Sequence, residues 1–322
     1  MLARFLLPLG LLSFVACAAS DDGSPPPAAK SAPVAKKKAK KTHKDKVRPP
    51  EREEARAESE SPREKPSEEP AAPKVEKPEC PEEMVLVQGD YCRAVEQRCL
   101  EQLSTPDAGA DENRCARFEA SKCTSTAPEP RKMSYCMDRY EYPGKVGELP
   151  MTLVSWTDAE RVCQAEGKRL CTESEFTFAC EGEKMLPYTY GYERDPKKCN
   201  IDKPYQTPQK HLLPYDQCLA NPSCAAEYKR VDGREPIGSH PECVSPFGIY
   251  DLNGNANEWV SQPWKNPPHR SGIKGGWWGP VRNRCRAITL SHGETYLGYE
   301  VGFRCCKDAT GAVDGGAPDA QP

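Results

Sequence analysis

The sequence predicts a disulfide-rich α+β domain that follows a long polar N-terminal segment, and three observations support this prediction. The 322-residue chain has 17 cysteines, and all except Cys17 lie between Cys80 and Cys306. Short strand-like runs and two helices with recognisable ends share that stretch. Proline and charged residues dominate the region before it. The net charge of −3 argues against a nucleic-acid partner, which requires a concentrated basic surface.

The first residues are typical of an export signal. Arg4 supplies a positive charge, and the apolar run from Leu6 to Val15 is too short to span a bilayer. The run ends in Phe14-Val15-Ala16-Cys17, which resembles a lipobox, a signal whose cysteine is lipidated and becomes the first residue of a bacterial lipoprotein. We therefore expect residues 1–16 to be a lipoprotein signal peptide and Cys17 to carry the lipid that anchors the chain to a membrane. An ordinary cleaved signal with an unrelated cysteine is the alternative.

The export signal affects two further predictions, the location of the protein and the use of its cysteines. No acidic residue directly follows Cys17, and by resemblance to Gram-negative sorting rules this favours the outer membrane of the cell envelope, with the domain in the periplasm or at the cell surface. An oxidising compartment also makes disulfides the expected use of the cysteines. Zinc sites are the alternative, but the sequence has no Cys-x-x-Cys pair and its five histidines are scattered.

Residues 17–78 are predicted to be a disordered tether. Between Asp21 and Glu79 no apolar side chain larger than valine occurs, so the segment cannot offset the entropy cost of ordering. A lysine block from Lys36 to Lys46 precedes a mixed acidic stretch, which is typical of a solvated spacer. Contact of the lysine block with anionic headgroups or the cell wall is the alternative. Residues 308–322 are predicted to form a disordered tail.

The predicted domain, residues 79–307, opens with strand-like runs. Met84–Val87 is a short β-type run that Gly89-Asp90 is expected to end, and the alternating aromatic stretch Tyr135–Tyr142 predicts a second strand. Between them, residues 92–123 hold four cysteines and a polar patch. We expect this region to be an insertion held by disulfides.

Two helices are expected next. The first would run from Thr157-Asp158 to Gly167, because Ala159, Val162 and Cys163 recur at helical spacing and glycine is a common stop. The second would begin at the capping box Thr172–Glu175 and bury the side of the helix that carries Phe176.

Two longer stretches complete the domain. Residues 181–245 show little periodicity and are interpreted as loops. Residues 247–306 are dense in glycine, tryptophan and asparagine, which predicts tight turns between short strands.

The order of these segments resembles the formylglycine-generating enzyme family, also called the sulfatase-modifying factor domain. The resemblance implies the fold of that family, an α+β unit with little regular structure that is related to C-type lectin-like domains. Each matching stretch is short, and their order along the chain carries the resemblance. The matching stretches are Met84–Val87, Asp138–Glu141, Val154–Ala159, Gly167–Leu170, Thr172–Phe176, Phe247–Asn255, Glu258-Trp259, Lys274–Gly276 and Gly302–Cys305.

The resemblance also implies two disulfides. The family joins its first-helix cysteine to the cysteine of a terminal Gly-Phe-Arg-Cys motif, which here pairs Cys163 with Cys305. It joins its second-helix cysteine to the one that ends Arg-x-Arg-Cys, which here pairs Cys180 with Cys285. A third bridge between Cys171 and Cys306 is a further hypothesis, and the partners of the other cysteines stay open.

A structural calcium ion is the next implication, because Asp251–Glu258 matches the segment that wraps Ca²⁺ in family members. Asp251 and Glu258 would supply carboxylates, and Gly254 and Ala256 would supply backbone carbonyls, as this hard cation prefers oxygen ligands. A rigid turn without an ion is the alternative. A second family site would use Asn200-Ile201, but its aspartate partner is replaced near Gly238, which argues against it.

The catalytic metal of the family is not expected. Family enzymes oxidise a cysteine of a sulfatase to formylglycine and hold Cu(I) with two cysteines between the Gly-Gly and Arg-x-Arg-Cys motifs. Here residues 277–283 contain tryptophan, proline and arginine but no cysteine, so copper is excluded from the prediction. No histidine pair at i, i+4 spacing supports iron.

These absences favour a non-catalytic, membrane-anchored protein that uses the fold to bind a peptide, protein or glycan. A formylglycine-generating-type oxidase or a divergent metal-dependent oxygenase acting on an exported protein is the alternative, and a structural spacer is a third hypothesis. Exposed tryptophans are good anchors for extended peptides and sugar rings, although Trp259 and Trp278 could equally be core residues. The expected groove residues are Trp259, Gly276, Trp277, Trp278 and Arg304.

Overall fold

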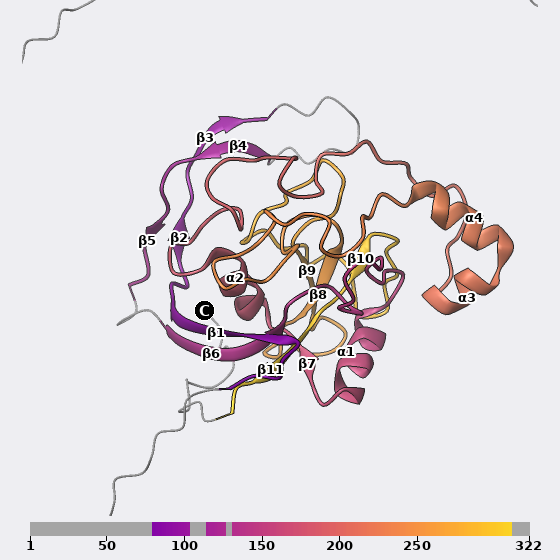
Figure 1. Ribbon diagram of the computed structural model, residues 1–322, viewed down its shortest axis with the longest axis horizontal. Coiled ribbons are helices and arrows are strands. Elements are labelled where there is room, and N and C mark those ends of the chain that lie inside the picture. Colours follow the sequence, from indigo (N-terminus) through magenta and orange to yellow (C-terminus); the bar gives the residue numbers. More distant parts are fainter. Residues whose placement is uncertain (1–78, 104–113, 127–130, 311–322) are drawn as a thin grey trace, which may run out of the picture. The chain divides into compact units, whose positions relative to one another are not determined.

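The computed structural model describes residues 79–103, 114–126 and 131–310 (Figure 1). The predicted signal peptide, Cys17, the tether and the C-terminal tail lie outside these residues. Within the described part of the chain, no helix is long and apolar enough to cross a membrane.

A four-stranded sheet joins the two ends of the domain. Its order is β1 (Met84–Tyr91), β6 (Arg131–Asp138), β11 (Cys305–Asp308) and β7 (Arg169–Leu170), and every neighbouring pair is antiparallel. The prediction that Gly89-Asp90 ends β1 is wrong, because pairing with β6 continues until Tyr91 lies opposite Arg131. β6 also begins earlier and ends earlier than predicted.

A second sheet of three strands lies closer to the candidate site. β8 (Asn257–Ser261) pairs antiparallel with β9 (Ser271–Lys274) and parallel with the two-residue strand β10 (Val301–Gly302). In the predicted insertion, residues 92–123, two short ladders form. β2 (Val95–Glu96) pairs with β5 (Lys122–Cys123), and β3 (Cys99–Gln102) pairs with β4 (Cys115–Phe118).

The two predicted helices are present with slightly different ends. α1 covers Trp156–Ala165, because the Ser155 hydroxyl caps its first turn by accepting a hydrogen bond from the Asp158 amide. α2 covers Glu173–Glu181, and both hydrogen bonds of the Thr172–Glu175 capping box are formed. The predicted capping box is therefore confirmed.

The stretch predicted to be only loops contains two further helices, α3 (Tyr215–Ala220) and α4 (Pro222–Val231). Asn221 separates them, and its side-chain oxygen accepts hydrogen bonds from the amides of Ser223 and Cys224. Proline at the first helical position completes a standard start signal. The sequence therefore carried a cap at this point, and the buried residues Cys224, Tyr228 and Val231 of α4 recur at helical spacing.

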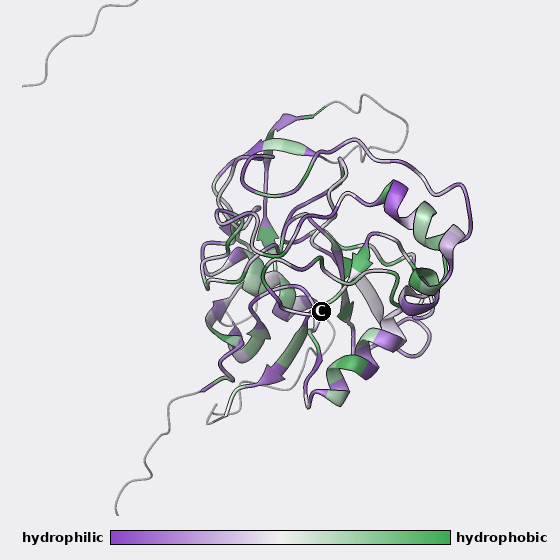
Figure 2. Cartoon of the chain, turned by 45° about the vertical axis from the view of Figure 1, so that its right-hand side comes forward, coloured by the Kyte–Doolittle hydropathy of each residue, from purple (hydrophilic) through white to green (hydrophobic). Residues whose placement is uncertain are grey.

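The interior has two main apolar clusters. One surrounds Phe176 and Phe178 of α2 and includes Val87 and Met137 from the four-stranded sheet. The other packs Trp156 of α1 against Trp259, Val301 and Phe303. Figure 2 shows hydrophobic residues on the strands in the middle of the domain, with hydrophilic residues frequent in the surrounding loops.

Eight disulfides use all of the cysteines from Cys80 to Cys306. Cys163 pairs with Cys305 and Cys180 with Cys285, the pairs that the family resemblance implies. Cys171 also pairs with Cys306, as hypothesised. By joining α1, α2 and the residue after β7 to the C-terminal part of the chain, these bridges tie distant segments into one unit. The other pairs are Cys80–Cys136, Cys92–Cys123, Cys99–Cys115, Cys199–Cys243 and Cys218–Cys224.

Candidate functional site

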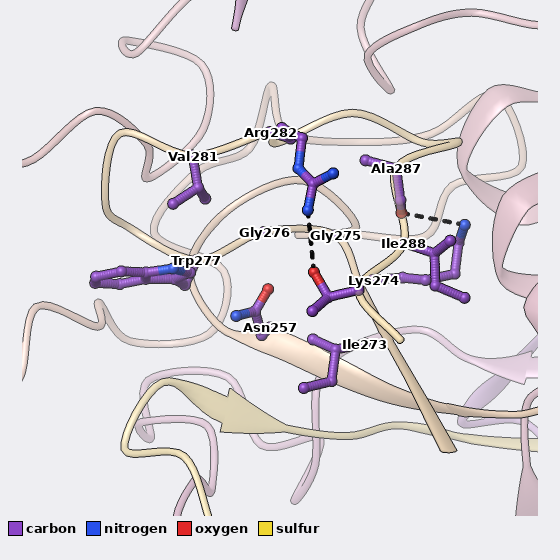
Figure 3. Close-up of a pocket in the computed structure, with 11 residues that line it drawn as sticks. Asn257, Ile273, Lys274, Gly275, Gly276, Trp277, Val281, Arg282, Ala287 and Ile288 are labelled. Atoms are coloured by element: carbon purple, nitrogen blue, oxygen red, sulfur yellow. Dashed lines mark hydrogen bonds between the residues drawn. The ribbon is translucent and has the colours of Figure 1, made fainter. Parts of the chain in front are cut away.

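A pocket of about 110 Å³ lies where β9 ends and the following loop begins (Figure 3). Ile273 of β9 and Thr289 exchange backbone hydrogen bonds of 3.0 and 2.9 Å, which fixes the returning segment beside the strand. The loop between them folds over the pocket. The lining residues are Asn257, Ile273, Lys274, Gly275, Gly276, Trp277, Val281, Arg282, Ala287, Ile288 and Thr289.

The glycine pair after β9 is required by backbone geometry. Gly275 and Gly276 have φ angles of 85° and 76°, a region that favours glycine. A Cβ atom on Gly276 would also lie only 2.5 Å from the Asn283 side-chain nitrogen. The two glycines therefore allow Asn283 to pack directly under the loop.

Asn283 holds this loop from below. It is fully buried, and its side-chain nitrogen donates a 2.6 Å hydrogen bond to the Trp277 carbonyl. Arg194 donates to the Asn283 side-chain oxygen at 2.6 Å and to the Val281 carbonyl at 3.0 Å. An amide and a guanidinium thus fix the segment in which the resemblance places the copper-binding cysteines of family enzymes.

The described domain also has no free thiol that could reach this segment. The eight disulfides account for every described cysteine, from Cys80 to Cys306. Soft thiolate ligands for Cu(I) are therefore absent from the described residues. Cys17, outside them, is the remaining cysteine of the sequence.

The predicted groove forms only in part. Gly276 and Trp277 line the pocket, and Trp277 is 9% exposed. Trp259 and Trp278, whose exposure the sequence left open, are each 1% exposed. Trp259 packs in the core beside α1 and donates a hydrogen bond to the Val154 carbonyl at 2.8 Å. The alternative interpretation of these two tryptophans as core residues is correct.

Trp277 belongs to an aromatic cluster beside the pocket. Its ring lies 4.7 Å from Tyr205, 4.9 Å from Trp278 and 5.8 Å from Tyr299, measured between ring centroids. All three contacts are edge-to-face, an arrangement that stabilises aromatic pairs. The cluster holds Trp277 in a fixed position at the pocket.

Arg304 is not a groove residue either. It is 1% exposed and donates hydrogen bonds of 2.7 and 2.6 Å to the two carboxylate oxygens of Glu258. The motif that ends the family signature therefore serves an internal ion pair, and the prediction that Arg304 contacts a ligand is wrong.

This ion pair is part of an acidic cluster in the predicted calcium segment. Glu141, Asp251 and Glu258 are all buried, and burial raises the pKa of each carboxyl, that of Asp251 to about 6. Glu141 accepts hydrogen bonds from the Asn255 side chain at 2.7 Å and the Ala256 amide at 3.0 Å. Arg304 pairs with Glu258, and its charge also acts on Glu141 and Asp251.

The four predicted calcium ligands, Asp251, Gly254, Ala256 and Glu258, fit calcium only in part. Arg304 occupies both oxygens of Glu258, so this carboxylate does not present a free ligand. Within the described residues, no group of three or more His, Cys, Asp or Glu side chains could hold a metal ion. Asp251 does fit, because its Oδ1 atom is buried without a hydrogen-bond partner. A calcium ion here would rely on Asp251 and on the carbonyls of Gly254 and Ala256.

The pocket also carries two cations that the sequence prediction did not identify as functional. Lys274 is 2% exposed, and its Nζ donates a 3.3 Å hydrogen bond to the Ala287 carbonyl. Burial lowers the pKa of this ammonium to about 8. Arg282 donates to the Thr289 hydroxyl at 3.3 Å. Both cations could have been noticed in the sequence, because Lys274 directly precedes the glycine pair and Arg282 lies in the segment that lacks cysteine.

Comparison with known proteins identifies the family. The model of the sulfatase-modifying factor enzyme 1-like domain matches residues 75–309. An inactive C-alpha-formylglycine-generating enzyme 2 from Bos taurus is 28% identical over 170 residues, which cover 50% of this chain and 51% of that protein. A formylglycine-generating enzyme from Bos taurus is 29% identical over 118 residues, which cover 36% of this chain and 27% of that protein.

The match thus spans about half the length of the first of these relatives. Among solved structures, PvdO from Pseudomonas aeruginosa aligns with a TM-score of 0.40 and 16% identity, covering 70% of this chain and 94% of that chain. CarF aligns with a TM-score of 0.44 and 14% identity, covering 70% and 97%.

Proposed function

The chain belongs to the family defined by the sulfatase-modifying factor enzyme 1-like domain, and we propose that it is a member that binds a ligand and does not oxidise one. One observation carries this proposal. Every described cysteine is in a disulfide, and the loop that would hold copper contains Trp277 and Arg282 but no cysteine. Cu(I) activation requires soft ligands that this site does not supply.

The relatives support the non-catalytic proposal without deciding it. Two of them, from Bos taurus and Mus musculus, are named as inactive formylglycine-generating enzymes. Two others are named as formylglycine-generating enzymes, so the oxidase alternative has a basis in the comparisons as well. The site chemistry is what favours binding.

The ligand in this proposal is an extended peptide that lies against the pocket at Trp277. The loop is rigid, since Asn283 and Arg194 fix its backbone, and a fixed surface loses little entropy when it binds. A peptide is favoured over a glycan because the family acts on a peptide strand. Trp277 contributes an apolar face next to the cations of the pocket.

Membrane attachment is also part of the proposal. Cys17 would carry lipid and the polar residues after it would act as a spacer, which places the domain near the outer membrane of a bacterial envelope. The substitution C17S should move the protein from the membrane fraction to the soluble fraction. Retention of C17S in the membrane fraction would contradict the anchor.

A structural calcium ion is the last component. We propose that Ca²⁺ binds Asp251 and offsets part of the negative charge of Glu141 and Glu258, which Arg304 alone balances in the described residues. The cation would stabilise the turn between β8 and the segment before it. It would take no part in a reaction.

The test of the central proposal is a turnover assay. The full chain, loaded with Cu(I) under oxygen, is incubated with a cysteine-containing sulfatase peptide, and mass spectrometry measures conversion of cysteine to formylglycine. No conversion is expected, while a formylglycine-generating enzyme treated in parallel should convert the peptide. Conversion that depends on added copper would establish the oxidase alternative.

A further inference from the structure

Glu300, directly before β10, carries a carboxylate without a counter-ion in the described residues. Its Oε2 atom is buried and has no hydrogen-bond partner. Burial raises the pKa of this carboxyl to about 7, opposed by a hydrogen bond from its own backbone amide and by no cation of the described chain. A cation within about 4–6 Å would favour the charged form of the carboxyl.

Gly298 makes room for this carboxylate. A Cβ atom on Gly298 would lie 3.1 Å from Oε2 of Glu300 and 3.0 Å from Cε1 of Tyr296. Because glycine has no Cβ, the carboxylate and the Tyr296 ring can both pack here. Oε2 is enclosed at this point, whereas Glu300 as a whole is only half-buried, so a ligand can approach the residue from solvent.

Two tyrosines lie next to the carboxylate. Burial and the charge of Glu300 raise the pKa of Tyr296 to about 12, and both also raise the pKa of Tyr299. Each of these tyrosines is half-buried. Because the faces of aromatic rings attract cations, tyrosines beside a carboxylate favour a positively charged ligand.

Glu300 also lies close to the surface proposed for the peptide. Its carbonyl accepts a 2.8 Å hydrogen bond from the amide of Asn257, which lines the pocket, because β10 runs beside β8 (Figure 1). The ring of Tyr299, the preceding residue, lies 5.8 Å from that of Trp277. A peptide that packs on Trp277 can therefore place a neighbouring side chain at Glu300.

We propose that Glu300 binds the ammonium group of a lysine side chain, so that the peptide partner carries a lysine next to the residue that meets Trp277. The inference rests on the proposed peptide-binding function and specifies its partner. Lysine is favoured over arginine because Oε2 is enclosed beside Gly298, which leaves one carboxylate oxygen for a ligand. A guanidinium binds best when it can bond to both oxygens, whereas an ammonium acts as a point charge.

The experiment titrates the full chain with fluorescein-labelled pentapeptides Ala-Leu-X-Leu-Ala that have blocked ends, in which X is lysine, arginine, glutamine or glutamate. Fluorescence anisotropy should show binding of the lysine peptide at least about tenfold tighter than of the glutamine and glutamate peptides. The variant E300Q should weaken the lysine peptide by a similar factor and leave the affinity for the glutamine peptide unchanged. The matched control E242Q removes an exposed carboxylate and should change none of these affinities.

Each alternative outcome has a separate meaning. Equal affinity of the unsubstituted protein for the lysine and glutamine peptides would overturn the basic partner and leave the peptide-binding function in place. Tighter binding of the arginine peptide than of the lysine peptide would overturn the assignment to lysine. Equal weakening of the lysine and glutamine peptides by E300Q would show that Glu300 supports the fold and does not bind the ligand. Binding of none of the peptides would contradict both proposals.

Discussion

Arg304 donates hydrogen bonds of 2.7 and 2.6 Å to the two carboxylate oxygens of Glu258, and both side chains are 1% exposed. The pair lies 46 residues apart in sequence and joins the second residue of β8 to the residue directly before β11. Two residues of the family signature therefore form an ion pair inside the domain that stabilises the fold.

Breaking this pair should destabilise the domain strongly. The substitution R304M leaves the Glu258 carboxyl buried beside Glu141 and Asp251 without its cation, and loss of one partner of a buried ion pair costs about 3–5 kcal/mol. Urea denaturation followed by tryptophan fluorescence measures the free energy of unfolding. The double variant R304M/E258L removes both charges and should recover part of the loss. Equal stability of R304M and the unsubstituted protein would show that the pair does not support the fold.

The long-range disulfides should contribute more than the short one. Removal of Cys163–Cys305, with a separation of 142 residues, should cost about 3 kcal/mol more than removal of Cys218–Cys224, with a separation of 6. Longer loops lose more entropy in the unfolded chain when they are closed. The double alanine variants form a matched pair, because the cysteines of both bridges are buried. Equal midpoints in thermal denaturation would contradict this account.

Stability should decrease as the pH rises from about 4.5 to 7. Burial raises the pKa of Glu300 from 4.5 to about 7, and its Oε2 atom is buried without a hydrogen-bond partner. The folded chain therefore binds this proton more tightly than the unfolded chain, and the resulting stabilisation is full below pH 4.5 and is lost through pH 7.

The variant E300Q tests this dependence. Its melting temperature should fall less between pH 5 and pH 7.5 than that of the unsubstituted protein. The control E242Q changes a carboxylate that is 72% exposed and should follow the unsubstituted protein. Identical pH profiles for E300Q and the unsubstituted protein would assign the dependence to other groups.

Much of the local structure follows from the sequence, because its causes are local. The capping box at Thr172 consists of four consecutive residues. The disulfide partners of the cysteines in α1 and α2 came from the resemblance to the family. The helices on either side of Asn221 were missed because the prolines, tyrosines and cysteines of this stretch were interpreted as a sign of loops.

The site was harder to predict for a different reason. A tryptophan beside a glycine-rich turn has the same sequence context whether it faces solvent or the core, and Trp259 and Trp278 face the core. Arg304 and Glu258, like Lys274 and its carbonyl partner on Ala287, meet only after the chain has folded. Sequence reasoning identified the missing cysteines of the loop but did not identify the cations that line the pocket instead.

Calcium should stabilise the domain through Asp251. A cation that binds only the folded chain raises the melting temperature with its concentration. Addition of millimolar Ca²⁺ after treatment with EDTA should raise the melting temperature of the unsubstituted protein but not that of D251N. The variant D232N, which changes an aspartate paired with Arg234, serves as the control. An unchanged melting temperature of the unsubstituted protein on addition of Ca²⁺ would contradict the proposed calcium site.

The central claim is that the domain offers no thiol to a soft metal, and Cu(I) titration tests it most directly. Full-chain C17S, whose remaining cysteines are all in disulfides, is titrated with Cu(I) in competition with a chromogenic chelator. The account predicts that the chelator keeps all of the copper. Transfer of one Cu(I) per chain to the protein would contradict it.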